Sequence, residues 1–255
     1  MRHWTMTGLA LALAMSVSAC QAEKAGAARE NKADAPRAAA GSGGATTRDF
    51  ALSGFTGVEV AGPDDVTIRR GDAFLIVARG PKAELDELDI RQDGDTLLIG
   101  RKREGFSFRR GDGDDVEIRI TMPRLTAARL TGSGEIDADV IEGDSVAAAL
   151  TGSGDLHVGK LTAKRATVTL TGSGDLDVGG GAVEEASYRV MGSGNIEASA
   201  LAATKLAVAI AGSGNVEAQA TGTAEVEILG AGDATVEGGA QCKTRTMGSG
   251  TATCR

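Results

Sequence analysis

The tripeptide Gly-Ser-Gly recurs along the second half of the chain with a period of twenty residues. The spacing shortens to eighteen near the end, where Gly230-Ala231-Gly232 stands in place of one copy. The glycines of the Gly-Ser-Gly copies are Gly132, Gly134, Gly152, Gly154, Gly172, Gly174, Gly192, Gly194, Gly212, Gly214, Gly248 and Gly250. A fixed period of this length predicts an architecture in which each repeat forms one structural unit.

Apolar and polar residues alternate on both sides of each tripeptide. Val168 and Leu170 precede one copy, and Leu176 and Val178 follow it. Alternation with period two predicts a strand with one buried face, and the recurrence of the pattern predicts that equivalent residues stack from repeat to repeat. The apolar spacing never follows the 3.6-residue period of a helix. We therefore expect an all-β solenoid with coils of about 18–20 residues, each turning at a Gly-Ser-Gly corner.

Glycine suits such a corner for two reasons. A sharp turn needs backbone angles that are costly with a Cβ, and stacked corners bring neighbouring backbones close together. The serine can bond backbone groups or the serine of the next coil. Loops that bind phosphate precede a helix N-terminus, whereas each Gly-Ser-Gly here precedes a predicted strand, so we expect a structural role for the tripeptide.

Composition narrows the class of partner. The formal net charge is −8, which argues against nucleic acid and against attraction to an anionic membrane surface. Aromatic residues make up only 3% of the chain, so the core must be built from Val, Leu, Ile and Ala in thin layers.

The N-terminus has the features of an export signal. Residues 1–19 contain an apolar run too short to span a bilayer, and Val17-Ser18-Ala19-Cys20 ends it. This ending resembles a bacterial lipobox, in which Cys20 is lipidated and becomes the mature N-terminus. An ordinary secretory signal with a chance cysteine is the alternative. Gln21 after the cysteine favours sorting to the outer membrane, so we expect a cell-envelope lipoprotein that contacts the membrane only through its lipid.

Three segments follow from these patterns. Residues 20–48 lack apolar periodicity and predict a disordered tether. Residues 49–255 form the folded domain, in which 126–255 hold the Gly-Ser-Gly coils. Residues 49–125 keep strand alternation without the motif, and we expect them to begin the same solenoid with less regular coils that cap its N-terminal end.

The folded part also resembles a known family. A Phe-x-Gly-Val-x-Val sequence spans 55–60, Leu85-Asp86-Glu87-Leu88 is acidic, and Met122-Pro123-Arg124-Leu125 leads into the repeats. Together these resemble the bacterial family called the putative autotransporter-adhesin head, or GIN, domain, over about residues 50–250. The resemblance implies a right-handed parallel β-helix, export from the cytoplasm and an adhesin role. It carries no catalytic residues onto this chain.

Two cysteines fall in the last coil. Cys242 and Cys254 occupy positions that point inward from the two strands flanking the final corner. An exported protein meets an oxidising compartment, so we predict a disulfide between them that seals the C-terminal end. Two free buried thiols are the alternative.

Acidic residues stack at the positions that follow the corners. Asp155 and Asp175 share one column, and Asp177 lies in the next with His157. Carboxylates one coil apart repel, and a weakly held cation such as Ca²⁺ would relieve this. Ordinary solvation is the interpretation we favour, with stacked Asn195 and Asn215 forming an amide ladder. We thus expect no metal and no other cofactor.

The predicted function is noncatalytic adhesion or scaffolding by a lipid-anchored β-helix, with an unidentified envelope protein or glycan as partner. The alternative is a carbohydrate-active enzyme, because other β-helices cleave acidic polysaccharides. Such enzymes use clustered acids on loops that grow from the coils, and these repeats carry no long insertions. A role as a signalling partner in the envelope is not separable from adhesion by sequence.

Overall fold

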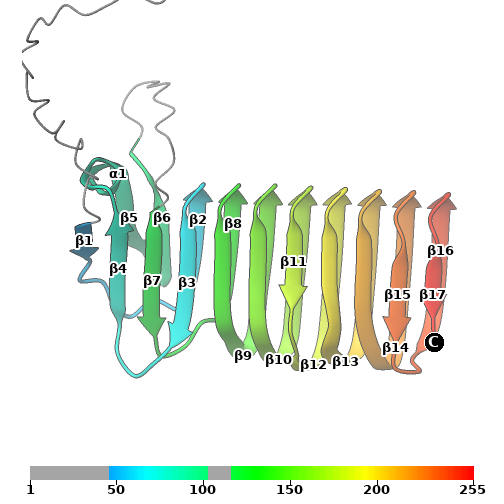
Figure 1. Cartoon of the computed structure of the whole chain (residues 1–255). Helices are drawn as coiled ribbons and strands as arrows, with labels where there is room; N and C mark the ends of the chain where they lie inside the picture. Colours follow the sequence, from blue (N-terminus) through cyan, green and yellow to red (C-terminus); the bar gives the residue numbers. More distant parts are fainter. Residues whose placement is uncertain (1–45, 103–115) are drawn as a thin grey trace, which may run out of the picture. The chain divides into compact units, whose positions relative to one another are not determined.

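The computed structural model describes residues 46–102 and 116–255, and most of these residues form stacked parallel coils (Figure 1). The N-terminal elements are β1 (Thr46–Asp49), β2 (Gly57–Gly62), β3 (Asp65–Arg70), β4 (Leu75–Gly80), α1 (Lys82–Glu87), β5 (Leu88–Asp93), β6 (Thr96–Arg101) and β7 (Glu117–Met122). The elements of the repeats are β8 (Ala127–Gly132), β9 (Glu135–Gly152), β10 (Asp155–Gly172), β11 (Asp175–Val178), β12 (Gly181–Gly192), β13 (Asn195–Gly212), β14 (Asn215–Gly230), β15 (Ala234–Glu237), β16 (Gln241–Gly248) and β17 (Ala252–Cys254). The predicted parallel β-helix is confirmed.

Each coil contributes to two walls that meet at the glycine corner. Strands that approach the corner form sheet one, whose first coil contains β2 and whose last contains β16. Strands that leave the corner form sheet two, from β3 to β17. The long strands, such as β10, leave one corner and bend around to reach the next. The pairing register equals the repeat, so Leu156 lies beside Ile136 on one side and Leu176 on the other.

The core lies between the walls and consists of stacked aliphatic columns. One column on sheet two is at most 1% exposed over four successive coils, at Ile136, Leu156, Leu176 and Ile196. The core columns contain Val, Leu, Ile and Ala with one tyrosine, as the low aromatic content requires. Because coils stack at about 4.8 Å, each column brings its side chains into contact along its whole length.

The backbone geometry of the corners explains why glycine is required there. The first glycine of every Gly-Ser-Gly has a positive φ, +135° at Gly192. A Cβ on Gly192 would lie 2.2 Å from the carbonyl oxygen of Gly172 in the preceding coil. The same oxygen accepts hydrogen bonds from the backbone of Ser193 at 2.9 Å and Gly194 at 3.2 Å. The stacked corners are therefore too close, and too tightly bonded, for any larger residue.

One coil has a larger residue at one core position and a smaller residue at another than its neighbouring coils have. Tyr188 takes the core position that Val168 and Val208 occupy in the neighbouring coils, and its ring is completely buried. In the same coil Gly181 pairs with Leu161 and Leu201, both buried. We attribute the exchange to packing, since a coil that gains an aromatic ring must lose volume elsewhere. The Tyr188 hydroxyl has no hydrogen-bond partner, and burial raises its pKa.

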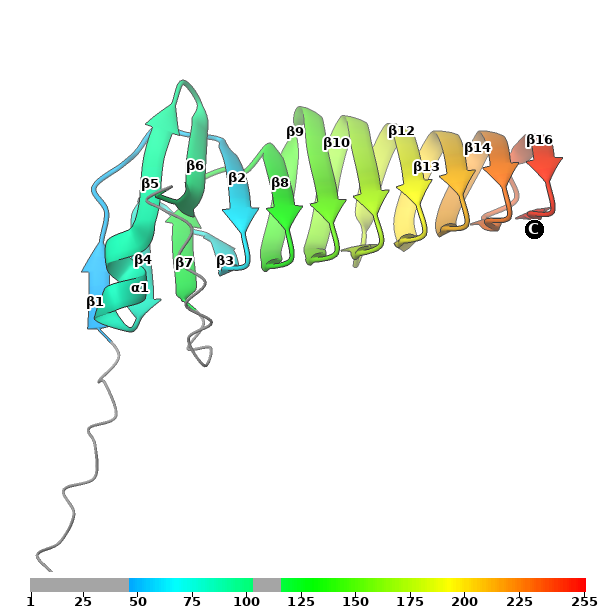
Figure 2. The ribbon, with the colours of Figure 1, turned by 90° about the horizontal axis from the view of Figure 1, so that it is seen from above.

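The N-terminal region forms coils only in part. β2 and β3 make a true coil, with Gly62 stacked beneath Gly132 at the corner. Next to this coil, β6 pairs parallel with β2 and β7 pairs parallel with β3, whereas β4 pairs antiparallel with β7 and β1, and β5 pairs antiparallel with β6. These strands and α1 cover the end of the stack (Figure 2). Residues 49–125 thus continue the stack with less regular pairing and carry the antiparallel strands that end it.

A buried acid joins the cap to the first coil. Asp64 stands at the first corner where later corners have their second glycine, and its side chain is 1% exposed. β6 and β7 pair with the two strands that meet at this corner, and the end of β6 brings Arg101 to the Asp64 side chain. Arg101 at the end of β6 pairs with Asp64 and with Glu84 of α1, and these carboxylates raise the pKa of Arg101.

The last coil carries the disulfide. Cys242 and Cys254 are joined, with their Cα atoms 6.5 Å apart, and the bond links sheet one to sheet two. Both residues continue buried columns, after Ala224 and Val236, but are themselves exposed. The reason is that they lie in the final described coil, which covers the core on one side only.

Two sequence predictions concern the first part of the chain. The signal segment and Cys20 lie outside the described residues. β1 begins at Thr46, inside the segment 20–48 assigned to the tether, so the folded part starts before residue 49.

Candidate functional site

A hydrogen-bonded ladder follows the corners along sheet two. The Asn215 amide donates to Asn195 Oδ1 at 3.0 Å, and the Asn195 amide donates to Asp175 Oδ1 at 2.8 Å. In the other direction, Asn215 Oδ1 accepts the backbone N–H of Asp233 at 3.1 Å. The backbone N–H of Asp175 donates to Asp155 at 3.4 Å. The predicted amide stacking thus joins side chains of successive coils.

The adjacent column on sheet two holds charged pairs. His157 Nδ1 lies 3.1 Å from Asp177 Oδ2, and both side chains are partly exposed. Arg69 of the first coil donates to Asp137 at 2.6 Å, and this bond holds the pKa of Asp137 below its ordinary value. These contacts relieve part of the repulsion between stacked acids.

The cation candidates therefore have protein partners. Asp175 accepts a hydrogen bond from Asn195, Asp177 pairs with His157, and Asp155 accepts a backbone N–H. Within the part of the chain that the structure describes, no group of three or more His, Cys, Asp or Glu residues could hold a metal ion.

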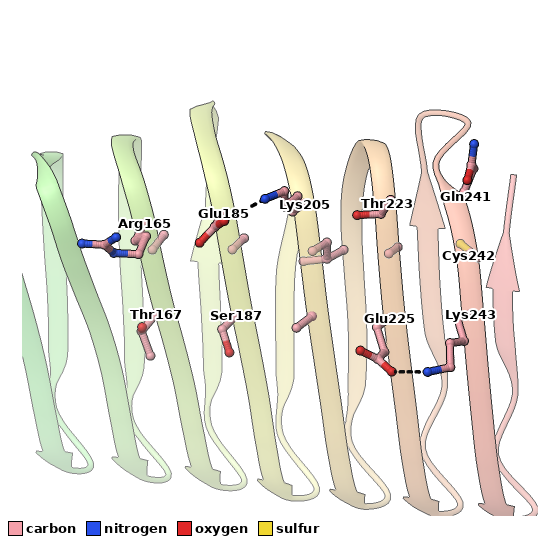
Figure 3. Close-up of a pocket in the computed structure, with 15 residues that line it drawn as sticks. Arg165, Thr167, Glu185, Ser187, Lys205, Thr223, Glu225, Gln241, Cys242 and Lys243 are labelled. Carbon is pink, nitrogen blue, oxygen red and sulfur yellow. Dashed lines mark hydrogen bonds and ion pairs between the residues drawn. The ribbon is translucent and has the colours of Figure 1, made fainter.

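A furrow crosses sheet one. It has a volume of about 660 Å³ and runs across five strands, β10, β12, β13, β14 and β16. Two rows of outward side chains border it, one from Arg165 to Gln241 and one from Thr167 to Lys243 (Figure 3). The rows lie two residues apart on every strand. The furrow is thus built entirely by the coil repeat, with no inserted loop.

Charges in the furrow are largely neutralised within it. Lys205 pairs with Glu185 at 3.0 Å in one row, and Lys243 pairs with Glu225 at 2.9 Å in the other. Arg165 donates to the Ser145 hydroxyl at 3.3 Å. Hydroxyl and amide groups occupy most of the other outward positions. The result is a surface rich in hydrogen-bonding groups with little net charge.

The alternation in the sequence assigns inward and outward positions on each strand but did not reveal the furrow. Its signal is the alternation of Glu and Lys at the coil period, Glu185 with Lys205 and Glu225 with Lys243. Charge alternation was visible, but a hollow depends on the path of the backbone between the rows. His157, which the sequence places in the column of Asp177, has a half-exposed side chain.

No helix among the described residues is long and apolar enough to cross a membrane. No curated protein matches the chain. Several solved structures share its fold.

A putative adhesin from Bacteroides fragilis aligns with a TM-score of 0.71 and 20% identity, covering 83% of this chain and 97% of that one. A putative adhesin from Parabacteroides distasonis aligns with a TM-score of 0.63 and 20% identity, covering 84% and 98%. A putative lipid binding protein from the same species aligns with a TM-score of 0.61 and 23% identity, over the same shares. At these identities the likeness establishes the fold.

The family comparison is more direct. The sequence profile described as "Putative auto-transporter adhesin, head GIN domain" matches residues 54–240. That range begins just before β2, includes the cap and extends through the repeat coils to the start of the last one. The match covers most of the chain and agrees with the resemblance seen in the sequence. The chain therefore belongs to the auto-transporter adhesin head GIN domain family.

Proposed function

We propose that this protein is a noncatalytic binding protein of the bacterial cell envelope, anchored by a lipid on Cys20 and recognising an envelope protein or glycan. The observation that carries the proposal is the regular spacing of outward polar side chains on a rigid stack. Within each row one side chain follows another at every coil, at a spacing of about 4.8 Å. They suit contacts that are individually weak and collectively strong.

Two further points support binding over catalysis. The family is described as an adhesin head, and two of the structural neighbours are described as adhesins. In the described residues, the histidine-carboxylate pair His157–Asp177 lies on an open sheet face with no nucleophile in the pair. General acid-base or nucleophilic catalysis needs such groups converging around a shared substrate position.

The recognition part is tested with the Cys20→Ser chain, which lacks the proposed lipidation site. The labelled chain is incubated with isolated envelopes of the bacterium that encodes it, and the bound fraction is measured against concentration. We expect saturable binding that excess unlabelled chain displaces. Binding that rises linearly and resists displacement would refute specific recognition.

The anchor is tested separately in cells. The wild-type chain should incorporate labelled fatty acid and fractionate with membranes, whereas Cys20→Ser should do neither. Equal membrane association of the two chains would remove the lipid anchor from the proposal and leave recognition untouched.

A further inference from the structure

We propose that the furrow on sheet one binds a neutral, extended polysaccharide that lies along the stack of coils. The inference rests on the proposed envelope-binding function and names the class of partner for one surface. The length, the charge and the backbone chemistry of the furrow each support it.

The length of the furrow favours a polymeric ligand. Its lining comes from five successive coils, and at about 4.8 Å per coil the outermost strands are separated by roughly 19 Å. Each coil offers the same two outward positions, one in each row. A small molecule would contact one or two coils, whereas an extended chain can contact all five. The repeat of the protein thus fits a repeating ligand.

The pairing of charges within the furrow favours a neutral ligand. Glu185 and Glu225 are each paired with a lysine inside the furrow. An anionic polymer would have to compete with these carboxylates and with the overall charge of −8, and a polycation would have to displace the lysines. Paired charges still offer hydrogen bonds to hydroxyl groups, and Thr223 and Gln241 add uncharged donors and acceptors at one end of the furrow.

The backbone favours a glycan over a peptide. A peptide strand gains affinity by pairing its amides with a free sheet edge. In the furrow, β10, β12, β13 and β14 are each paired on both sides, so their backbone groups bond along the stack. Along these four strands side chains alone face the ligand, and they are suited to ring hydroxyls, whereas β16 is paired, among the described strands, only with β14. Because no aromatic ring lines the furrow, affinity must come from hydrogen bonds summed over several sugars.

The test titrates the full chain with neutral β-1,4-linked oligomers of glucose, mannose and N-acetylglucosamine, from two to six units, by calorimetry. For at least one series we expect affinity to rise with length and to level off at about five units, when the furrow is filled. Oligogalacturonates and an extended acidic peptide serve as the charged and polypeptide alternatives. Tighter binding of either alternative, or binding that does not depend on length, overturns the proposal.

Two variants place the binding in the furrow. Ala207→Trp fills its centre from β13, and we expect a loss of at least about tenfold, equivalent to about 1.4 kcal/mol. Ala211→Trp on the same strand lies outside the furrow and should bind like the wild type. Thr223→Ala combined with Gln241→Ala should weaken binding without adding bulk. Melting temperatures establish that each variant is folded.

The outcomes separate this inference from the general function. If no neutral series binds, or if Ala207→Trp and Ala211→Trp bind equally well, the furrow assignment is wrong. Saturable binding of the same chain to envelopes would then still support the proposed function. Loss of envelope binding in Ala207→Trp alone would support both.

Discussion

Substituting one corner glycine tests how tightly the coils are locked together. Gly192→Ala adds a methyl group 2.2 Å from the Gly172 carbonyl oxygen, at a residue with φ of +135°. Contacts of this kind below 3.0 Å are essentially never found, so the two coils must open locally by about 0.8 Å. The oxygen that must move is the one that accepts hydrogen bonds from Ser193 and Gly194.

The expected loss of stability has two parts. A left-handed backbone conformation at a residue with a Cβ costs about 1–2 kcal/mol. Weakening the two hydrogen bonds to Gly172 costs about 1 kcal/mol for each bond. Together these predict that Gly192→Ala lowers the free energy of unfolding by about 3–4 kcal/mol, which for a domain of this size lowers Tm by roughly 10 °C.

Urea unfolding followed by circular dichroism measures the change, with Ser193→Ala as the matched control in the same corner. Alanine already occupies this position at Ala231, so the control should stay within about 0.5 kcal/mol of the wild type. A loss below 1 kcal/mol in Gly192→Ala would refute the reasoning, because the corners would then tolerate a side chain.

Three further predictions address the core, the last coil and the charged column. Tyr188→Phe removes a buried hydroxyl without a partner and should raise stability by about 1 kcal/mol, measured by thermal melting; a loss would mean that the hydroxyl is bonded. Cys254→Ser removes the disulfide, which closes a loop with a sequence separation of 12, and should lower the free energy of unfolding by about 2–3 kcal/mol in the absence of reductant. Reductant should have no further effect on the variant. Arg69→Met should remove most of the stability that Asp137 contributes through its lowered pKa, since the hydrogen bond from Arg69 is the largest cause of that lowering. In the wild type this contribution is complete above the ordinary value of 3.8 and is lost as pH falls through the lower folded value, so the two chains should converge only in strong acid.

The repeat coils were predictable because every level of the sequence agrees. The tripeptide spacing set the coil length, and the alternation around it assigned inward and outward columns. The pairing of Leu156 with Ile136 and Leu176 follows directly from these columns. Even the disulfide partners could be placed, since both cysteines fall in inward columns of one coil.

The cap was harder to predict for a physical reason. Strand alternation in β4, β5 and β7 shows which face is buried but says nothing about whether a neighbour is parallel or antiparallel. The Asp64–Arg101 pair joins residues 37 positions apart that share no repeat. Pairings of this kind depend on the end of the stack, where the periodic rule no longer applies. The furrow escaped prediction similarly, because columns give the order of side chains and not the curvature of the surface.

The central claim is that the outward side chains of this solenoid bind a partner and do not transform it. The most direct measurement follows one sample of the Cys20→Ser chain with isolated envelopes, recording the bound fraction and any released sugars over the same hours. We predict saturable binding and no release above the level seen without protein. Steady release of soluble fragments in proportion to protein concentration would contradict the claim and favour a polysaccharide-cleaving enzyme.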